Sequence, residues 1–153
     1  MLSFMLAKRL MERVVKESPS PLHKLIRVIL FAARSWFFDI NYRELAKEQL
    51  WRMLEDFRRY LEQYGLHYEN EYFDCDDFAV AFKNFAVVHY KTNGVGIALG
   101  ILRKDGKVLG GHAWNVAVLD NGDIVYIEPQ TCEYFYSNKS SDGFEYELLA
   151  VVW

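Results

Sequence analysis

The chain has 153 residues, the length of one ordinary domain and enough to bury a core without disulfides or a structural metal. Hydrophobic residues make up 52% and aromatic residues 16% of the chain, which excludes a disordered polypeptide and predicts an aromatic-rich core. A formal net charge of -3 argues against nucleic acid as the main partner, since duplex binding depends on clustered lysine and arginine.

The first 65 residues are expected to be helical. Apolar residues recur at helical spacing from Leu2 to Val15, opposite a basic face, and this pattern predicts a first helix that covers a core or, less often, lies on an anionic membrane. A second helix over about Leu22–Phe38 is apolar nearly all round and is therefore expected to be central. The spacing Asn41-Tyr42-Arg43-Glu44 is that of a capping box, and it predicts a third helix that ends at Gly65.

The remaining chain, residues 70–153, is expected to hold one more helix and a sheet. A fourth helix is predicted from about Asp74 to Val88, and Lys91-Thr92-Asn93-Gly94 ends it. From there the apolar period changes to two, which predicts antiparallel strands at 96–103, 108–119, 123–127 and 144–153. The expected fold class is therefore α+β in a single domain over 1–153, with N-terminal helices followed by an antiparallel sheet and the fourth helix packed on that sheet.

The N-terminus and the apolar runs give no sign of a membrane-spanning or secreted protein. The chain reaches Lys8 and Arg9 before an apolar core develops, unlike a signal peptide, and the longest apolar run, 28–33, is too short to cross a bilayer. The chain has only two cysteines, Cys75 and Cys132, and their number and positions do not suggest a fold held together by disulfides. We expect a cytoplasmic protein with reduced thiols.

Three short motifs carry the functional hypothesis: Phe73-Asp74-Cys75-Asp76-Asp77-Phe78-Ala79, His112-Ala113-Trp114-Asn115 and Glu128-Pro129-Gln130. If Asp74 caps the fourth helix, Cys75 lies in its first turn, where free backbone N–H groups and the helix dipole favour a thiolate. His112 follows on a strand and Glu128 on the next strand. A nucleophile, a base and an orienting group in this order predict a cysteine hydrolase that acts on amide bonds through an acyl-enzyme.

The register of the second hairpin decides whether these groups can meet. A three-residue loop with Gly122 in the left-handed conformation pairs Leu119 with Asp123, which places Trp114 opposite Glu128 and His112 opposite Gln130 on one face. A two-residue turn would put Glu128 on the face away from His112. Gln130 is the second choice as the group that orients the imidazole, and Gly111 is expected to allow a close approach of substrate.

Negative side chains crowd the predicted nucleophile and raise two alternatives. Asp74, Asp76 and Asp77 either complement the helix dipole and face water, or they mark a divalent cation site with the oxygen ligands Asp76, Asp77, Glu128 and Gln130. A zinc site built from Cys75, His112 and an acid is a further possibility. Purely structural roles remain alternatives: Cys75 as a buried structural cysteine, His112 as a core or surface histidine and Glu128 as a charged residue at a strand end.

The three motifs together resemble two groups of proteins. Cysteine, histidine and acid on a helix followed by strands are similar to the transglutaminase-like cysteine proteinases of the papain-like superfamily. More closely, residues 70–131 resemble the C-terminal cysteine-protease domain of the Marasmius oreades agglutinin and its small stand-alone relatives. The resemblance implies a calcium-activated protease of papain-like fold, with Cys75 as nucleophile, His112 as base and Glu128 as third member or metal neighbour.

The resemblance has limits that leave a second function open. It does not cover the first three helices, and the agglutinin's sugar-binding trefoil has no counterpart here. No glutamine precedes Cys75 at the usual oxyanion position, so that Asn70 or the backbone N–H of Cys75 would have to serve. Substrate contacts are expected from Trp114 and Gly111, with a peptide or protein as substrate. The alternative is a non-catalytic protein-interaction module that retains the fold and uses the first helix and exposed aromatic residues as its partner surface.

Overall fold

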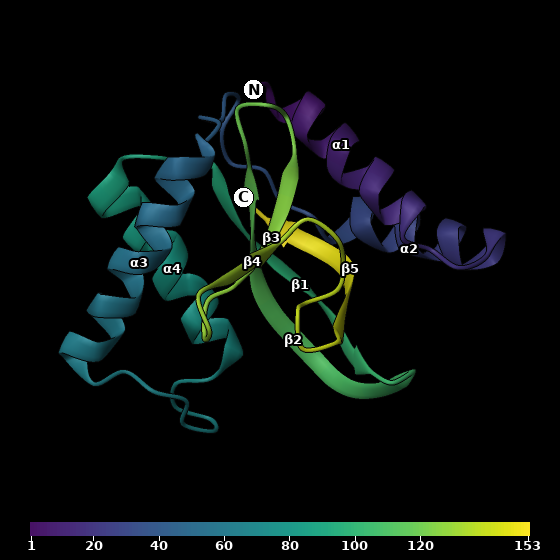
Figure 1. Cartoon of the computed structure of the whole chain (residues 1–153). Coiled ribbons are helices and arrows are strands. Elements are labelled where there is room, and N and C mark those ends of the chain that lie inside the picture. Colours follow the sequence, from purple (N-terminus) through teal and green to yellow (C-terminus); the bar gives the residue numbers. More distant parts are fainter.

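A computed structural model describes residues 1–153 as four helices and one five-stranded sheet (Figure 1). The helices are α1 (Ser3–Lys16), α2 (Pro21–Arg34), α3 (Lys47–Tyr64) and α4 (Cys75–Tyr90), and the strands are β1 (Val95–Lys104), β2 (Lys107–Val118), β3 (Ile124–Glu128), β4 (Glu133–Phe135) and β5 (Phe144–Val152). The strand order is β4-β3-β2-β1-β5, and every neighbouring pair is antiparallel. The expected α+β class is confirmed, whereas a papain-like core is not.

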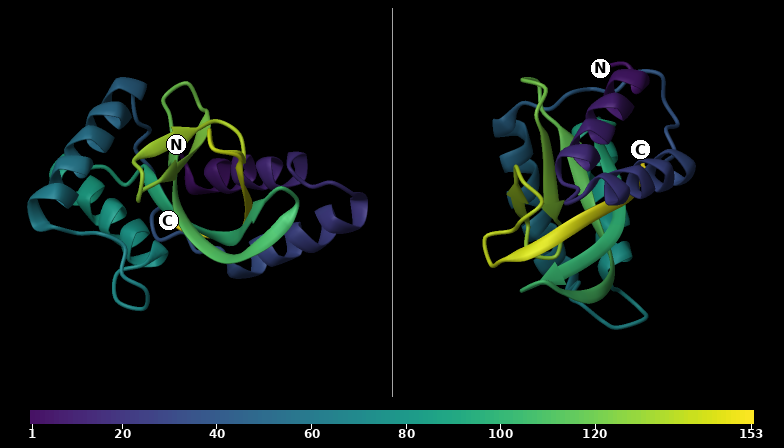
Figure 2. Two further views of the ribbon diagram at one scale, coloured as in Figure 1. Left: turned by 60° about the horizontal axis from the view of Figure 1, so that its bottom comes forward. Right: turned by 90° about the vertical axis from the view of Figure 1, so that its right-hand side faces the viewer.

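The sheet separates two hydrophobic cores, because alternate residues of a strand point to opposite faces. Figures 1 and 2 show α1 and α2 on one side of the sheet and α3 and α4 on the other. Strand β2 supplies Trp114, Val116 and Val118 to the core beneath α1 and α2. Its intervening residue Ala117 packs in the core beneath α3 and α4. Both helical layers are thus built on the same central strand.

The capping box at Asn41 does not form, and the third helix begins later than its spacing predicts. Helix α3 starts at Lys47, and its N-cap Ala46 makes no side-chain capping bond. The preceding segment is extended because it is used elsewhere: Leu45 pairs with Leu119, and Tyr42 is buried in the first core. Tertiary pairing here outweighs a local capping signal. The predicted end at Gly65 is confirmed, with a left-handed φ of 62°.

The second helix is shorter and more exposed than predicted. Helix α2 ends at Arg34, and Trp36 pairs with Val152 as an extended segment beside β5. Only Phe31 and Arg27 of the helix are buried. The expectation that α2 is central is wrong, because the helix packs on β5 with one face and leaves its other apolar face in solvent.

The short strand β4 was not predicted. Three residues, Glu133–Phe135, pair with β3 at the sheet edge, directly after a turn in which Cys132 adopts a positive φ of 56°. A three-residue segment has no measurable period, so its pairing depends on the neighbouring strand. None of the helices is both long enough and apolar enough to span a membrane.

Candidate functional site

The second hairpin adopts the register that brings the candidate residues to one face. Leu119 N–H donates to the Asp123 carbonyl oxygen at 2.8 Å, and Gly122 has a left-handed φ of 85°. Strands β2 and β3 pair Asn115 with Ile127 and Val116 with Tyr126. The three-residue loop is therefore confirmed, and the two-residue turn is excluded.

His112 and Glu128 meet across these strands in a nearly buried network. Nε2 of His112 lies 2.7 Å from Oε2 of Glu128, and the two side chains are 10% and 9% exposed. The Tyr146 hydroxyl of β5 donates to the same carboxylate oxygen at 3.0 Å. The backbone N–H of Gln130 donates to Oε1 of Glu128 at 3.3 Å. Both oxygens of this buried carboxylate are thus satisfied by the protein itself.

Cys75 opens helix α4, as its sequence context predicts. The Asp74 side chain accepts from the backbone N–H of Asp76 at 3.4 Å, and Asp77 accepts in return from the backbone N–H of Asp74 at 3.3 Å. This reciprocal capping box fixes the first turn of the helix. Cys75 is partly exposed there and faces His112 closely enough to influence its proton affinity.

The imidazole of His112 is held in its charged form. Burial disfavours that form, but the polar interactions with Cys75 and Glu128 and the negative charge of Glu128 outweigh it and raise the pKa of His112 to about 9. At neutral pH the network therefore contains an imidazolium beside a carboxylate. The hydrogen bond between them is charge-assisted and therefore strong.

The acids beside Cys75 do not join Glu128 and Gln130 in a single set of metal ligands. The cluster whose ligand atoms lie within 4.8 Å of one another consists of Asp74, Cys75 and Asp76. A hydrogen bond with Asp74, partial burial and the like charges of its neighbours raise the pKa of Asp76. One oxygen of Asp77 accepts in the capping box, and Glu128 accepts three hydrogen bonds from the protein. Calcium at Asp76, Asp77, Glu128 and Gln130 stays a prediction, and no step is assigned to a metal.

The remaining predicted residues lie in different surroundings. Gln130 lines a pocket beside His112. Trp114 is fully buried between His112, Tyr126 and Tyr146, so its ring does not reach a ligand. Gly111 is exposed, and no protein atom lies within 4 Å of the position a Cβ would take, so its role toward a substrate stays a prediction. Asn70 is exposed in the turn between Glu69 and Phe73 and makes no hydrogen bond to Cys75.

Sequence reasoning missed the contribution of the last strand to this site. A pocket of about 190 Å³ adjoins His112 and Glu128 and is also lined by Leu102, Gln130, Thr131, Glu133, Asp142, Phe144 and Tyr146. Tyr146 belongs to β5, which joins the site by pairing with β1. The alternation of apolar and polar residues around Tyr146 predicts a strand but not a contact with Glu128, so the sequence did not identify Tyr146 as a site residue.

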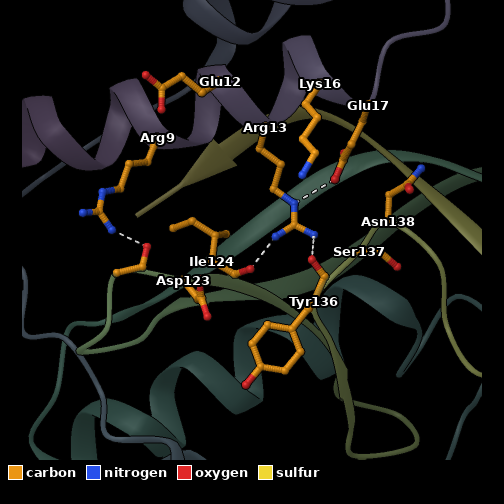
Figure 3. Close-up of a pocket in the computed structure, with 11 residues that line it drawn as sticks. Arg9, Glu12, Arg13, Lys16, Glu17, Asp123, Ile124, Tyr136, Ser137 and Asn138 are labelled. Atoms are coloured by element: carbon orange, nitrogen blue, oxygen red, sulfur yellow. Dashed lines mark hydrogen bonds and ion pairs between the residues drawn. The ribbon is translucent and has the colours of Figure 1, made fainter.

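A larger hollow of about 800 Å³ lies under α1, away from these residues (Figure 3). Its two arginine side chains already have partners in the protein. Arg13 donates to Glu17 at 2.7 Å, to the Tyr136 carbonyl at 2.5 Å and to the Ile124 carbonyl, while its guanidinium lies 4.2 Å from the centre of the Tyr126 ring. Arg9 donates to the Gly122 carbonyl. We assign this hollow to the attachment of α1 to the sheet.

Residues 43–134 match the family model described as "Agglutinin C-terminal", which is more than half of the chain. The chain belongs to the agglutinin C-terminal family. The matched region contains Cys75, His112 and Glu128 but excludes α1, α2 and all of β5. The predicted relationship to the C-terminal part of an agglutinin is thus confirmed. No curated protein matches the chain significantly.

Two solved structures share the fold of this agglutinin C-terminal chain. A PSL1a–E64 complex is 25% identical with a TM-score of 0.57, and the match covers 78% of this chain and 42% of that one. A Polyporus squamosus lectin bound to the human-type influenza-binding epitope Neu5Acα2-6Galβ1-4GlcNAc is 23% identical with a TM-score of 0.56 and the same coverage. The chain therefore spans less than half the length of either match.

These comparisons contradict the predicted thiol hydrolase. The family is described as an agglutinin, and the similar solved structures include a lectin bound to a glycan epitope. The expectation of a cysteine protease with a peptide substrate is therefore wrong. It failed because convergence of a thiol, an imidazole and a carboxylate is a geometric property, and geometry alone does not establish a reaction. The cytoplasmic location stays a prediction.

Proposed function

We propose that this protein is a non-catalytic binding module of the agglutinin C-terminal family and that it binds a saccharide in the pocket beside His112. The observation that carries the proposal is the chemistry of that pocket. The partly exposed ring of Phe144 lies among the side chains of Gln130, Glu133 and Asp142, above the buried ring of Tyr146. Aromatic rings bind the apolar face of a sugar, and amides and carboxylates accept or donate hydrogen bonds to its hydroxyl groups.

The buried network gives this pocket a fixed floor. Glu128 is held by His112, Tyr146 and the backbone of Gln130, so these groups need no rearrangement to receive a ligand. The imidazolium offers a charged donor in a partly dry environment, where such a hydrogen bond is stronger than in water. In this proposal His112 and Gln130 contact the ligand, whereas Glu128 positions them.

The size of the pocket limits the ligand. A volume of about 190 Å³ is below the roughly 300–1,000 Å³ of most small-molecule sites, so one sugar ring enters and the rest of a glycan lies outside. The glycan in the similar lectin supports this ligand class, although the shared region is under half of that chain. The second candidate is a protein-interaction module, which the exposed aromatic residue Tyr72, at 83% exposure, favours.

Titration with saccharides, followed by NMR, tests the proposal. A panel of monosaccharides and the trisaccharide Neu5Acα2-6Galβ1-4GlcNAc is added to the labelled protein. We expect shift changes at His112, Gln130 and Phe144, and a loss of binding in the Asp142→Asn and Phe144→Ala variants. The control is the Glu62→Gln variant, which is substituted at an exposed position of α3 and should bind as the wild type does. Absence of binding by every saccharide, or changes confined to other surfaces, would refute this function.

A further inference from the structure

The outer face of α2 is an exposed apolar stripe that the proposed saccharide site does not use. Leu22, Leu25, Ile26 and Ile29 follow the spacing i, i+3, i+4, i+7 and therefore lie on one side of the helix. They are 68%, 58%, 50% and 57% exposed. Contiguous exposed aliphatic side chains of this kind mark an interaction surface more often than isolated ones do. We call these four residues the α2 stripe.

Packing on the sheet fixes the direction in which the α2 stripe points. On the opposite side of the helix, Phe31 is 1% exposed in the first core, and Arg27 donates to the Leu148 carbonyl of β5 at 2.9 Å. The helix cannot turn its stripe inward without removing these contacts. Figure 2 shows α2 at the edge of the molecule with no element outside it. Trp36 and Phe38, which follow the helix, are also exposed, at 63% and 73%.

The charge of this part of the chain is opposite to that of the rest. Residues 1–40 contain seven Lys and Arg and three Asp and Glu, a net charge of +4, whereas residues 41–153 contain eleven and eighteen, a net charge of -7. No acidic residue occurs between Glu17 and Asp39. Lys24 and Arg34 lie at the two ends of α2 and form no ion pair. A negatively charged surface is thus attracted to the N-terminal 40 residues, which include α2, and repelled by the remaining chain.

We propose that the α2 stripe docks on a lipid bilayer that carries anionic headgroups. A helix with Leu and Ile on one face and basic residues outside that face lies in the plane of the interface, with its apolar side chains among the acyl chains. The 14 residues of α2 are suited to that orientation and not to crossing the membrane. A basic segment adds electrostatic attraction to phosphatidylserine headgroups. Four half-exposed aliphatic side chains by themselves fall short of the roughly 800 Å² that each partner of a stable dimer buries.

Vesicle sedimentation of the full chain tests this docking surface. The probes are vesicles of phosphatidylcholine alone and of phosphatidylcholine with about one-third phosphatidylserine. We expect binding to the anionic vesicles, weaker binding to neutral ones, and about a tenfold or greater loss of affinity in the Leu25→Glu/Ile29→Glu variant. The milder Leu22→Ser variant, at the most exposed position of the stripe, reports the apolar contribution without a charge change. Circular dichroism verifies that each variant is folded.

A matched control separates this surface from general exposure of apolar residues. The Trp51→Glu/Val88→Glu variant introduces the same two charges at positions that are 57% and 69% exposed on α3 and α4, and it should bind as the wild type does. Failure of the wild type to bind anionic vesicles would overturn the proposal, as would equal losses in both double variants. A wild-type dimer in light scattering that the Leu25→Glu/Ile29→Glu variant dissociates, without vesicle binding, would assign the stripe to a second copy of the chain instead.

Discussion

Replacing Glu128 by glutamine should lower the proton affinity of His112 without removing the side chain that holds it. The substitution keeps a hydrogen-bonding oxygen near the imidazole and near the Tyr146 hydroxyl but removes the negative charge 2.7 Å from Nε2. An opposite charge at this distance typically changes a pKa by about 1 to 3 units. We therefore expect the pKa of His112, about 9 in the wild type, to fall by at least about 1 unit in the variant.

The same change should alter how stability depends on pH. A raised folded-state pKa means that the folded protein binds more protons than the unfolded chain between the unfolded value of 6.5 and about 9. The stabilisation is complete below pH 6.5 and is lost as pH rises through about 9. The difference between the two pKa values corresponds to about 3 kcal/mol in the free energy of unfolding. Glu128→Gln should make this decline smaller.

NMR titration of the imidazole carbons and denaturant unfolding at several pH values measure both effects. Glu133→Gln is the control, because Glu133 lines the same pocket but accepts a hydrogen bond from the backbone N–H of Ser141 rather than from His112. The reasoning is refuted if His112 of the wild type titrates at or below 6.5. It is also refuted if Glu128→Gln and Glu133→Gln have the same effect on its pKa.

Three further predictions test other parts of the structure. Arg13→Leu should lower the free energy of unfolding, measured with denaturant, by about 3 kcal/mol, because it removes a nearly buried ion pair and two hydrogen bonds to carbonyl groups. The control Lys8→Leu should change the free energy of unfolding by less than about 0.5 kcal/mol, because Lys8 and its partner Glu12 are exposed and 3.8 Å apart. Gly100→Ala should lower the free energy of unfolding, measured by thermal denaturation, by about 2 kcal/mol or more, because the added Cβ would lie 2.0 Å from the Glu147 carbonyl oxygen. The control Gly111→Ala should be nearly neutral, because no atom lies within 4 Å of its Cβ position. Equal effects of the two substitutions would contradict the strand packing. Cys132 should react with iodoacetamide at pH 7.5 far more slowly in the folded than in the denatured protein, because burial raises the pKa of its thiol to about 11. Mass spectrometry measures both rates, and equal rates would show that the thiol is accessible.

Local rules account for the parts of this fold whose partners are close in sequence. The cap at Asp74 and the left-handed end at Gly65 depend on neighbouring residues only, and both formed where the sequence placed them. The hairpin from Val118 to Ile124 is likewise fixed by its loop, and its register brought His112 and Glu128 to one face. Residues that are close in sequence contact each other whenever their local turn forms. The order of these residue types therefore predicts the contact without knowledge of the rest of the fold.

Tertiary structure decided the features that require distant partners. Asn41 has the spacing of a helix cap, yet Leu45 joins Leu119 and keeps the segment extended. The apolar period of α2 is the same whether the helix is central or peripheral, and only packing on β5 showed which side faces solvent.

The sequence by itself determined the α+β class, the position of Cys75 at a helix start and the pairing that joins His112 to Glu128. The addition of Tyr146 and Asp142 to that site was decided by β5 and the loop before it, which are distant in the chain. The physical reason is that hydrogen bonding and periodicity act between near neighbours, whereas the composition of a pocket depends on which remote surfaces are buried together.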